Sequence, residues 1–313
     1  MKCLVTGAAG FIGSSLCERL LAEGHDVRGI DCFVPYYPKE QKLRNLAMLL
    51  KNSDFEFIEE DLSIAPLEVY LQDVEWIFHQ AAQAGVRASW GETFETYIRH
   101  NILGTQRLLE GAKSCPTLKK FIYASSSSVY GDAESFPTSE DARPQPVSPY
   151  GVTKLAGEHL CVLSAMHFGV PTVSLRYFTV YGPRQRPDMA FHRFIRAALA
   201  HKPLTLYGDG TQSRDFTFIS DAVEANLQAA ERGEPGAVYN IGGGAVISIN
   251  ALFDLLRTHF PWLNVERSAA QPGEARHTSA DISRAMAALG YRPRVSIEEG
   301  LDREIEWLRS LGA

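Results

Sequence analysis

The sequence contains no hydrophobic run of the roughly 18 residues that a helix needs to cross a bilayer, which excludes a membrane-spanning segment. Gly7 and Gly10 interrupt the apolar N-terminal stretch, so it does not resemble the core of a signal peptide. The five cysteines are odd in number, scattered, and never form a Cys-x-x-Cys pair. This argues against a disulfide framework and a structural zinc site. We therefore expect a soluble cytoplasmic protein with reduced thiols and no metal.

Positive charge is not in excess either. The chain has 31 lysines and arginines against 37 aspartates and glutamates, a formal net charge of −6. No general basic field is present to hold nucleic acid or an anionic membrane, so an anionic ligand must be bound by locally placed arginines and backbone amides. A chain of 313 residues, 45% hydrophobic and 22% charged, is typical of one large or two closely joined globular domains.

The N-terminal segment has the pattern of a β-α-β unit. Residues 2–6 form a short apolar run that ends at Gly7, a helical pattern follows over 12–21 and ends at Gly24, and residues 27–30 form a second apolar run. Two strands joined by a helix within about 30 residues indicate parallel strands with a right-handed crossover.

The same alternation continues, with strands predicted at 55–58, 76–79, 120–124 and 172–176 and helices at 97–113 and 150–168. It predicts an α/β fold with a doubly wound parallel sheet. We expect this domain to occupy residues 1–176, with a return segment at about 214–242 that brings residues 238–241 to the sheet edge. A smaller lobe, residues 177–213 and 243–313, is expected to close over the sheet and bind the substrate.

Three glycines, Gly7, Gly10 and Gly13, connect the first strand to the first helix, with Phe11 and Ile12 between the last two. Glycines in this spacing allow a tight turn, a close approach of backbone amides to a diphosphate, and close packing of helix on strand. The helix N-terminus adds unpaired N–H groups. A compact turn without a ligand is the alternative, but the position between a predicted strand and helix favours a dinucleotide site.

Asp31 ends the second predicted strand, 18 residues after Gly13. A carboxylate at this point accepts hydrogen bonds from the adenosine ribose and repels a 2′-phosphate, and Cys32 offers no compensating charge. This indicates NAD as the cofactor and not NADP, although Asp31 taken alone could be a simple turn residue. Asp61 and Leu62, after the third strand, are the expected neighbours of the adenine.

Tyr150 and Lys154 lie one turn apart on a predicted helix and so face the same side. A phenol with a pKa near 10 is a poor base at neutral pH, but a nearby ammonium and a positive nicotinamide favour the phenolate. Tyr150 would then take a proton from a hydroxyl group while hydride leaves the same carbon. Serines at 125–128, after a strand, supply hydroxyls to position the substrate. An exposed Tyr-Lys pair without a function is the alternative.

These motifs resemble the extended short-chain dehydrogenase/reductases, which have a Rossmann domain, and within them the NAD-dependent nucleotide-sugar epimerases and dehydratases. The resemblance spans the whole chain and also includes segments 79–82, 176–183 and 209–216. It implies that Ser126, Tyr150 and Lys154 are catalytic, that Lys154 also holds the nicotinamide ribose, and that Ala81 and Ala82 contact the cofactor. It further implies a homodimer formed by the helices at 97–113 and 150–168.

The residues before Val129 distinguish the reactions of this family. Related 4,6-dehydratases carry an Asp-Glu pair and UDP-glucuronate decarboxylases a glutamate where this chain has Ser127 and Ser128. Small hydroxyls instead suit C4 epimerisation through a 4-keto sugar. Segments 83–87 and 178–189 look most like UDP-glucuronate 4-epimerases, whereas galactose-type epimerases usually have asparagine in place of Thr179. A UDP-glucose or UDP-N-acetylglucosamine 4-epimerase, a UDP-glucuronate decarboxylase and a silent NAD-binding protein remain alternatives.

The expected substrate, a UDP-sugar, carries negative charge at two places. Ser127, Ser128 and Thr179 are candidates to bind a C6 carboxylate, and Arg186 is the candidate to constrain that pocket. The resemblance implies that Arg214 binds the diphosphate. Arg276 is a second candidate, although the family often has an arginine at Gln271, and Arg87 and Arg193 complete the predicted substrate-binding set.

Overall fold

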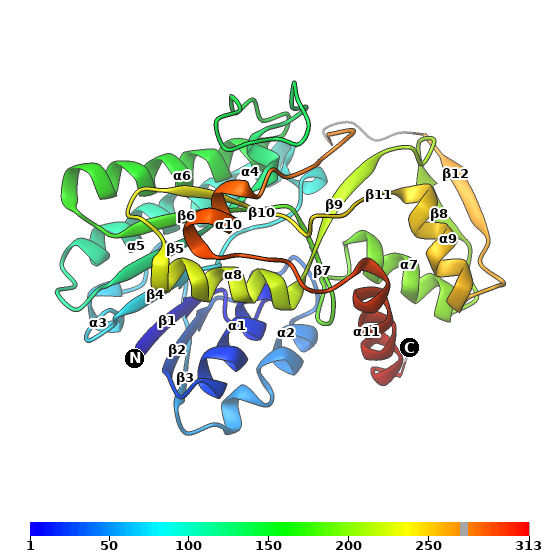
Figure 1. The fold of residues 1–313 in the computed structure, drawn as a ribbon. Helices are drawn as coiled ribbons and strands as arrows, with labels where there is room; N and C mark the ends of the chain where they lie inside the picture. The colour runs from blue at the N-terminus through cyan, green and yellow to red at the C-terminus, as the bar shows by residue number, and fades with distance from the viewer. Residues whose placement is uncertain (270–274, 313) are drawn as a thin grey trace.

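The computed structural model describes residues 1–269 and 275–312; Gln271 and the Pro-Gly-Glu segment before Arg276 lie outside these ranges. Its centre is a seven-stranded sheet in the order β10-β6-β5-β4-β1-β2-β3 (Figure 1). Every neighbouring pair is parallel, which confirms the predicted α/β class. The strands are β1 (Lys2–Thr6), β2 (Asp26–Asp31), β3 (Phe55–Glu59), β4 (Trp76–His79), β5 (Lys120–Ser126), β6 (Thr172–Tyr177) and β10 (Val238–Ile241).

Helices cover both faces of this sheet, as a parallel sheet requires. Cys3 and Val5 of β1 point into one apolar cluster, shared with α1 (Phe11–Ala22) and α8 (Ile219–Arg232). Leu4, between them, points into a second cluster, shared with α5 (Gly104–Lys113) and α6 (Pro149–Phe168). Alternate residues of this one buried strand therefore contact two helices on each face of the sheet.

The boundaries of α6 follow from its end residues. The Ser148 side chain accepts a hydrogen bond from Gly151 N at 3.1 Å, and Pro149 occupies the first turn. Gly169 ends the helix in the left-handed conformation, with φ of 69°. The helix expected at 97–113 is interrupted: α4 (Phe94–Tyr97) runs through a π-helical segment (Ile98–Leu103) into α5.

The C-terminal lobe is built from short elements. One small sheet has the order β11-β9-β7, and β8 pairs with β12. β9 falls within the expected return segment but pairs in the lobe, whereas β10 returns to the edge of the main sheet as predicted. The lobe elements are β7 (Thr179–Tyr181), α7 (Ala190–Leu199), β8 (Leu204–Tyr207), β9 (Ser213–Phe218), β11 (Val246–Ser248), α9 (Ile249–His259), β12 (Val265–Ser268) and α11 (Ile297–Ser310). α10 (Ser283–Leu289), although it falls within the expected lobe segment 243–313, packs against α8 and β10 of the main sheet.

The strand order reverses beside β1, because β2 and β3 lie on one side of it and β4, β5 and β6 on the other. Ligands of doubly wound sheets bind at this switch point, beyond the carboxyl ends of the strands. α2 (Lys39–Leu46) and α3 (Leu67–Tyr70) follow β2 and β3. Within the described ranges, no helix combines the length and the apolar character needed to cross a membrane.

Candidate active site

The glycine turn lies at the switch point and lines a deep pocket together with Ile12, Asp31, Tyr150 and Lys154. Gly7 has a φ of +70°, and a Cβ added to it would lie 2.8 Å from Ala81 N. A Cβ on Gly13 would lie 2.1 Å from the Gly7 carbonyl oxygen. Both positions therefore need glycine, because a Cβ would clash with neighbouring backbone, and the turn opens at the N-terminus of α1, where an anionic diphosphate is favoured. Gly10, Phe11, Leu62, Ala81 and Ala82 also line this pocket.

Asp31 lies at the end of β2 with its carboxylate fixed by backbone amides. Ala9 N donates to Oδ2 at 3.1 Å, and Phe33 N donates to Oδ1 at 2.8 Å. Lys42 Nζ, from α2, lies 3.9 Å from Oδ1, a neighbour that the sequence did not indicate. The carboxylate is thus held in one orientation, with a cation near it inside the pocket.

Asp61, expected beside the adenine, binds protein groups. It accepts a hydrogen bond from Ser63 N at 2.8 Å and pairs with the Arg99 guanidinium at 2.7 Å. Burial raises the pKa of Asp61, but its hydrogen bonds to Ser63 and the nearby charges outweigh burial and hold the pKa below its usual value. Leu62 and His100 line the pocket beside it.

Three potential metal ligands meet here: the Cys32 thiol, the Asp61 carboxylate and the His100 imidazole lie within 4.8 Å of one another. Burial raises the pKa of Cys32 to about 11, so the thiol keeps its proton at neutral pH. The Asp61 carboxylate of this group is already paired with the Arg99 guanidinium at 2.7 Å.

Ser126, Tyr150 and Lys154 meet where β5 ends against α6. Tyr150 hydrogen-bonds the Ser126 side chain, and Ser126 Oγ also accepts from Ser128 N at 3.1 Å. Lys154 is buried, with its ammonium 4.7 Å from the centre of the Tyr123 ring, and burial lowers its pKa to about 8. Lys154 therefore still carries its charge at neutral pH inside the pocket.

The sequence predicts that Lys154, together with a bound nicotinamide, lowers the pKa of Tyr150; among the protein's own groups a different cation has this effect. Burial dominates and raises the pKa of Tyr150. The charge that opposes burial belongs to Arg186, with a further contribution from the Ser126 hydrogen bond. Arg186 lies in the segment between β7 and α7, remote from Tyr150 in the sequence, and lines the same pocket.

A buried ion pair lies behind these residues and was not predicted. Arg176, at the end of β6, binds Glu158 of α6 through two hydrogen bonds, of 2.6 and 3.0 Å. Ser125 Oγ donates to the same carboxylate at 2.7 Å, and Arg176 also donates to the Tyr130 hydroxyl. The pair therefore joins the serine-rich end of β5 to the helix that carries Tyr150. Two charged residues within otherwise apolar elements were its only sequence signal.

His79, at the end of β4, is buried with both ring nitrogens in use. Nδ1 lies 2.7 Å from Thr6 Oγ1, and Nε2 lies 2.8 Å from Thr105 Oγ1. Burial lowers the pKa of His79 to about 3, so the ring is neutral. His79 is therefore a buried structural residue at the end of β4.

The residues predicted to bind a carboxylate follow directly after two neighbouring strands, β5 and β6. Ser127 and Ser128 begin the turn after β5, and Thr179 begins β7 just after β6, which pairs with β5. Their hydroxyls are thus brought to the same edge of the sheet as Ser126. The lining of the dinucleotide pocket includes Arg186 and Ser125 but not Ser127, Ser128 or Thr179.

The four remaining arginines form two groups. Arg87 and Arg193 both approach the Tyr207 ring, at 4.7 and 5.8 Å from its centre. Arg214 donates to the Arg276 carbonyl at 3.0 Å, while the Arg276 guanidinium pairs with Asp209 at 3.0 Å and is largely exposed. Arg193 lies on α7, Arg214 on β9 and Arg276 in a loop of the lobe, whereas Arg87 follows β4 of the main sheet.

Comparisons with known proteins agree with this geometry. A model of the NAD dependent epimerase/dehydratase family matches residues 3–242. An uncharacterized UDP-glucose epimerase of Bacillus subtilis is 49% identical, with 99% of each chain covered. A UDP-glucuronate 4-epimerase of Thermodesulfobacterium geofontis is 38% identical over 97% of this chain and 95% of the relative.

One similar solved structure is that of UDP-glucuronic acid 4-epimerase from Bacillus cereus, in complex with UDP-glucuronic acid and NAD. It is 48% identical, with a TM-score of 0.96, and the alignment covers 99% of this chain and all of that chain. The match extends through both the parallel sheet and the C-terminal lobe. The chain belongs to the NAD dependent epimerase/dehydratase family.

Proposed function

We infer that this protein is an isomerase that inverts C4 of UDP-glucuronate to form UDP-galacturonate, with NAD as its cofactor. The observation that carries this inference is the meeting of Tyr150, Lys154 and Arg186 with the glycine turn in one pocket. The Bacillus cereus protein, named UDP-glucuronic acid 4-epimerase, supports the substrate at 48% identity. Acid/base chemistry and dinucleotide binding are thus combined at one place.

The pocket residues fit NAD. The glycine turn places backbone at the N-terminus of α1 along the pocket wall, which suits a diphosphate, and the Asp31 carboxylate suits ribose hydroxyls. The buried Lys154 ammonium suits the nicotinamide ribose. Bound NAD supplies a hydride acceptor that takes hydrogen from C4 and returns it. Because the hydride returns to the sugar, the reaction has no net oxidation.

Tyr150 is the proposed base and acid. Its phenolate takes the proton of the C4 hydroxyl as the ketone forms, and its phenol returns a proton when the alcohol is restored. Ser126, whose side chain hydrogen-bonds Tyr150, would orient the C4 oxygen of the sugar. Inversion requires the keto sugar to rotate in the pocket, so that its other face is presented before the ketone is reduced.

Ser127 and Ser128 favour epimerisation over elimination or decarboxylation. They occupy the turn where related dehydratases and decarboxylases carry acidic residues, and hydroxyls cannot supply that acid/base pair. The oxidised form of UDP-glucuronate is a β-keto acid, which readily loses carbon dioxide. Hydroxyls of Ser127, Ser128 and Thr179 would hold the carboxylate out of alignment with the ketone, and Arg186 would restrict its movement.

The arginines supply the positive charge that the diphosphate needs in a chain of net charge −6. Arg214 is the proposed direct ligand, and Arg276 is the second. Arg87 and Arg193, around Tyr207, approach from the opposing loop and from α7. Their arrangement near one aromatic ring suits the uridine end of the substrate.

A second candidate substrate is UDP-glucose, because the Bacillus subtilis relative, at 49% identity, is named a UDP-glucose epimerase. Purified protein is incubated separately with UDP-glucuronate, UDP-glucose and UDP-N-acetylglucosamine without added NAD, and the products are resolved by chromatography. Conversion of UDP-glucuronate to UDP-galacturonate supports the proposal and a retained cofactor. Turnover of UDP-glucose alone reassigns the substrate, UDP-pentose as the main product indicates a decarboxylase, and NAD binding without turnover of any sugar indicates a silent protein.

We further propose a homodimer in the cytoplasm. α6 exposes a row of apolar side chains: Val152, Leu163, Met166 and Phe168. The neighbouring π-helical segment exposes Ile98 and Leu103. α5 and α6 lie side by side on one face of the sheet (Figure 1). Pairing this face with its copy would bury the row. Light scattering on the wild type and on Met166→Glu tests it, with a dimer expected for the first and a monomer for the second.

A further inference from the structure

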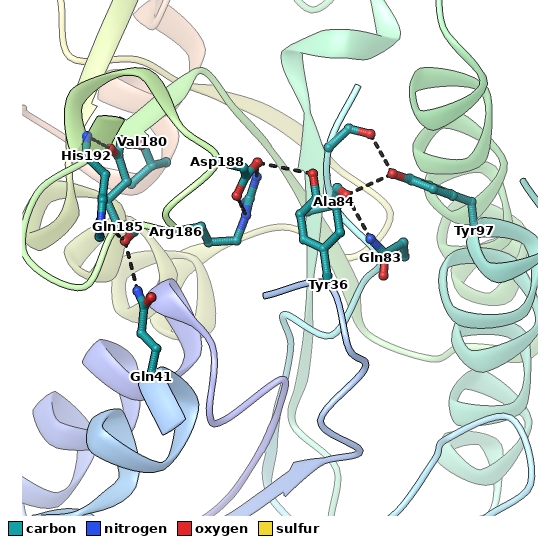
Figure 2. A network of polar contacts seen from close by, with 11 residues as sticks. Tyr36, Gln41, Gln83, Ala84, Tyr97, Val180, Gln185, Arg186, Asp188 and His192 are labelled. Atoms are coloured by element: carbon teal, nitrogen blue, oxygen red, sulfur yellow. Dashed lines mark hydrogen bonds and ion pairs between the residues drawn. The ribbon is translucent and has the colours of Figure 1, made fainter. Parts of the chain in front are cut away.

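Three loops meet at the rim of the dinucleotide pocket. Tyr36 lies in the loop after β2, Gly85 in the loop after β4, and Arg186 and Asp188 in the segment between β7 and α7. Tyr36 and Arg186 both line the pocket that contains the glycine turn. Residues from the dinucleotide-binding half and from the lobe side are therefore in contact across one opening (Figure 2).

Asp188 is the centre of this contact. Its carboxylate accepts two hydrogen bonds from Arg186, Nε at 3.0 Å to one oxygen and Nη2 at 2.9 Å to the other. The Tyr36 hydroxyl donates to Asp188 Oδ2 at 3.2 Å, and the Arg186 guanidinium lies 5.8 Å from the centre of the Tyr36 ring. Arg186 is thus held by a carboxylate on its own segment and by an aromatic ring on another loop.

The position of Tyr36 is fixed from behind by the loop after β4. A Cβ built on Gly85 would lie 2.1 Å from the Tyr36 hydroxyl oxygen, so only glycine allows the two loops to approach so closely. The Tyr97 hydroxyl lies 2.9 Å from the Ala84 carbonyl oxygen and 2.7 Å from that of Gly85. The hydroxyl of Tyr36 is therefore directed to Asp188 by a loop that is itself held.

The segment before Asp188 is anchored as well. Gln185 is buried, and its carbonyl oxygen accepts from Gln41 Nε2 at 3.3 Å and contacts His192 Nδ1 at 2.8 Å. Gln41 belongs to α2, so the lobe segment is tied to the dinucleotide-binding half at a second point (Figure 2). This leaves Arg186 projecting from a fixed backbone toward the pocket.

We propose that Tyr36 and Asp188 hold Arg186 across the rim of the dinucleotide pocket, and that this contact slows the release of the cofactor. The proposal rests on the proposed function, because it takes NAD as the occupant of the pocket. An epimerase must keep its reduced cofactor until the keto sugar has rotated and been reduced. A contact that delays cofactor release therefore prevents loss of the hydride before the reaction is complete. Tyr36 and Asp188 are positioning residues, since they act through Arg186 and through loop closure.

The test measures cofactor release directly. Wild-type protein, Tyr36→Phe, Asp188→Asn and the double variant are loaded with NADH and mixed with excess NAD, and the decay of bound NADH fluorescence gives the release rate. Losing one hydrogen bond to the carboxylate predicts release about threefold to tenfold faster in each single variant. The double variant should release NADH little faster than Asp188→Asn, because loss of the carboxylate already weakens its hydrogen bonds with both Tyr36 and Arg186.

Asp141→Asn is the matched control. Asp141 pairs with Arg284 at 2.8 Å on an exposed surface, and its substitution should leave the release rate at the wild-type value. A purely structural role for Tyr36 would lower the melting temperature without changing release measured well below it. If Asp188→Asn does not fold, Tyr36→Phe carries the test alone, because it leaves the Arg186–Asp188 ion pair intact.

Release at the wild-type rate from folded Tyr36→Phe overturns the proposal. Failure of the wild type to bind NADH at all would instead overturn the proposed function. Equal acceleration in Asp141→Asn would also contradict the proposal, because it would show that loss of any surface ion pair has this effect.

Discussion

Arg176 and Glu158 form a buried ion pair with two hydrogen bonds, and that pair ties the last residues of β5 to the helix that carries Tyr150. Both side chains are almost fully buried, with exposures of 6% and 4%. A buried charge that loses its partner is costly, so this contact constrains how the catalytic helix can pack.

Replacing one partner of this pair should destabilise the protein strongly. Glu158→Gln leaves the Arg176 charge buried without a carboxylate and is expected to lower the free energy of unfolding by about 3–5 kcal/mol. Glu110→Gln, which removes an exposed pair with Lys113 on α5, should change it by about 0.5 kcal/mol at most. Denaturant unfolding of both variants checks this, and equal effects of the two changes would contradict it.

The positive charge of Arg186 should affect the pH at which turnover rises. Tyr150 takes a proton only as the phenolate, so turnover rises with pH through the pKa of Tyr150. Burial raises that pKa and Arg186 opposes the rise, so Arg186→Met should raise the pKa further and move the ascending limb of kcat to higher pH. Arg186→Lys keeps the charge and should keep the limb near its wild-type position. A limb that stays in place in Arg186→Met would show that Arg186 does not act on Tyr150.

Arg186 should also influence which product forms. With UDP-glucuronate, Arg186→His is expected to increase the fraction of decarboxylated pentose product, because the carboxylate of the keto intermediate gains freedom to align with the ketone. Arg184→His is the control in the same segment, since Arg184 pairs with Glu18 of α1. Chromatography measures the ratio of pentose to epimerised product. An unchanged ratio in Arg186→His would show that Arg186 does not restrict the carboxylate.

Cofactor choice should depend on Asp31. Asp31→Asn removes the charge that repels a 2′-phosphate and keeps the Lys42 ammonium, which lies 3.9 Å from Asp31 Oδ1, as a positive charge near it. The affinity for NADP relative to NAD should rise roughly tenfold or more. Asp26→Asn, at the exposed start of the same strand, should leave the ratio unchanged. Titration of both nucleotides measures it, and an unchanged ratio in Asp31→Asn would contradict the assigned role of this carboxylate.

Local patterns in the sequence were sufficient for the fold around the pocket. Gly7 to Gly13 predicts a strand, a turn and a helix, and Ser148 and Gly169 delimit α6, because each signal acts within a few residues of itself. The π-helical segment within the expected 97–113 helix was not predictable, since its apolar periodicity resembles that of an α-helix.

The electrostatics of the site depend on contacts between distant segments. Lys42 beside Asp31, Arg186 near Tyr150 and Arg176 bound to Glu158 each join elements whose proximity is set by the sheet order and the lobe. The sequence places Lys154 one turn after Tyr150, which indicates a common face but not which cation acts on the phenol. Burial, which raises the pKa of Tyr150, is likewise a property of the packed structure.

Transfer of hydrogen at C4 is the most direct test of the account. UDP-glucuronate carrying deuterium at C4 is converted in ordinary water, and the product is analysed by mass spectrometry. Return of the same hydride predicts UDP-galacturonate that retains the label at C4, with turnover lowered by roughly 100-fold or more in Tyr150→Phe. Loss of the deuterium to water, or an undiminished rate in Tyr150→Phe, would contradict it.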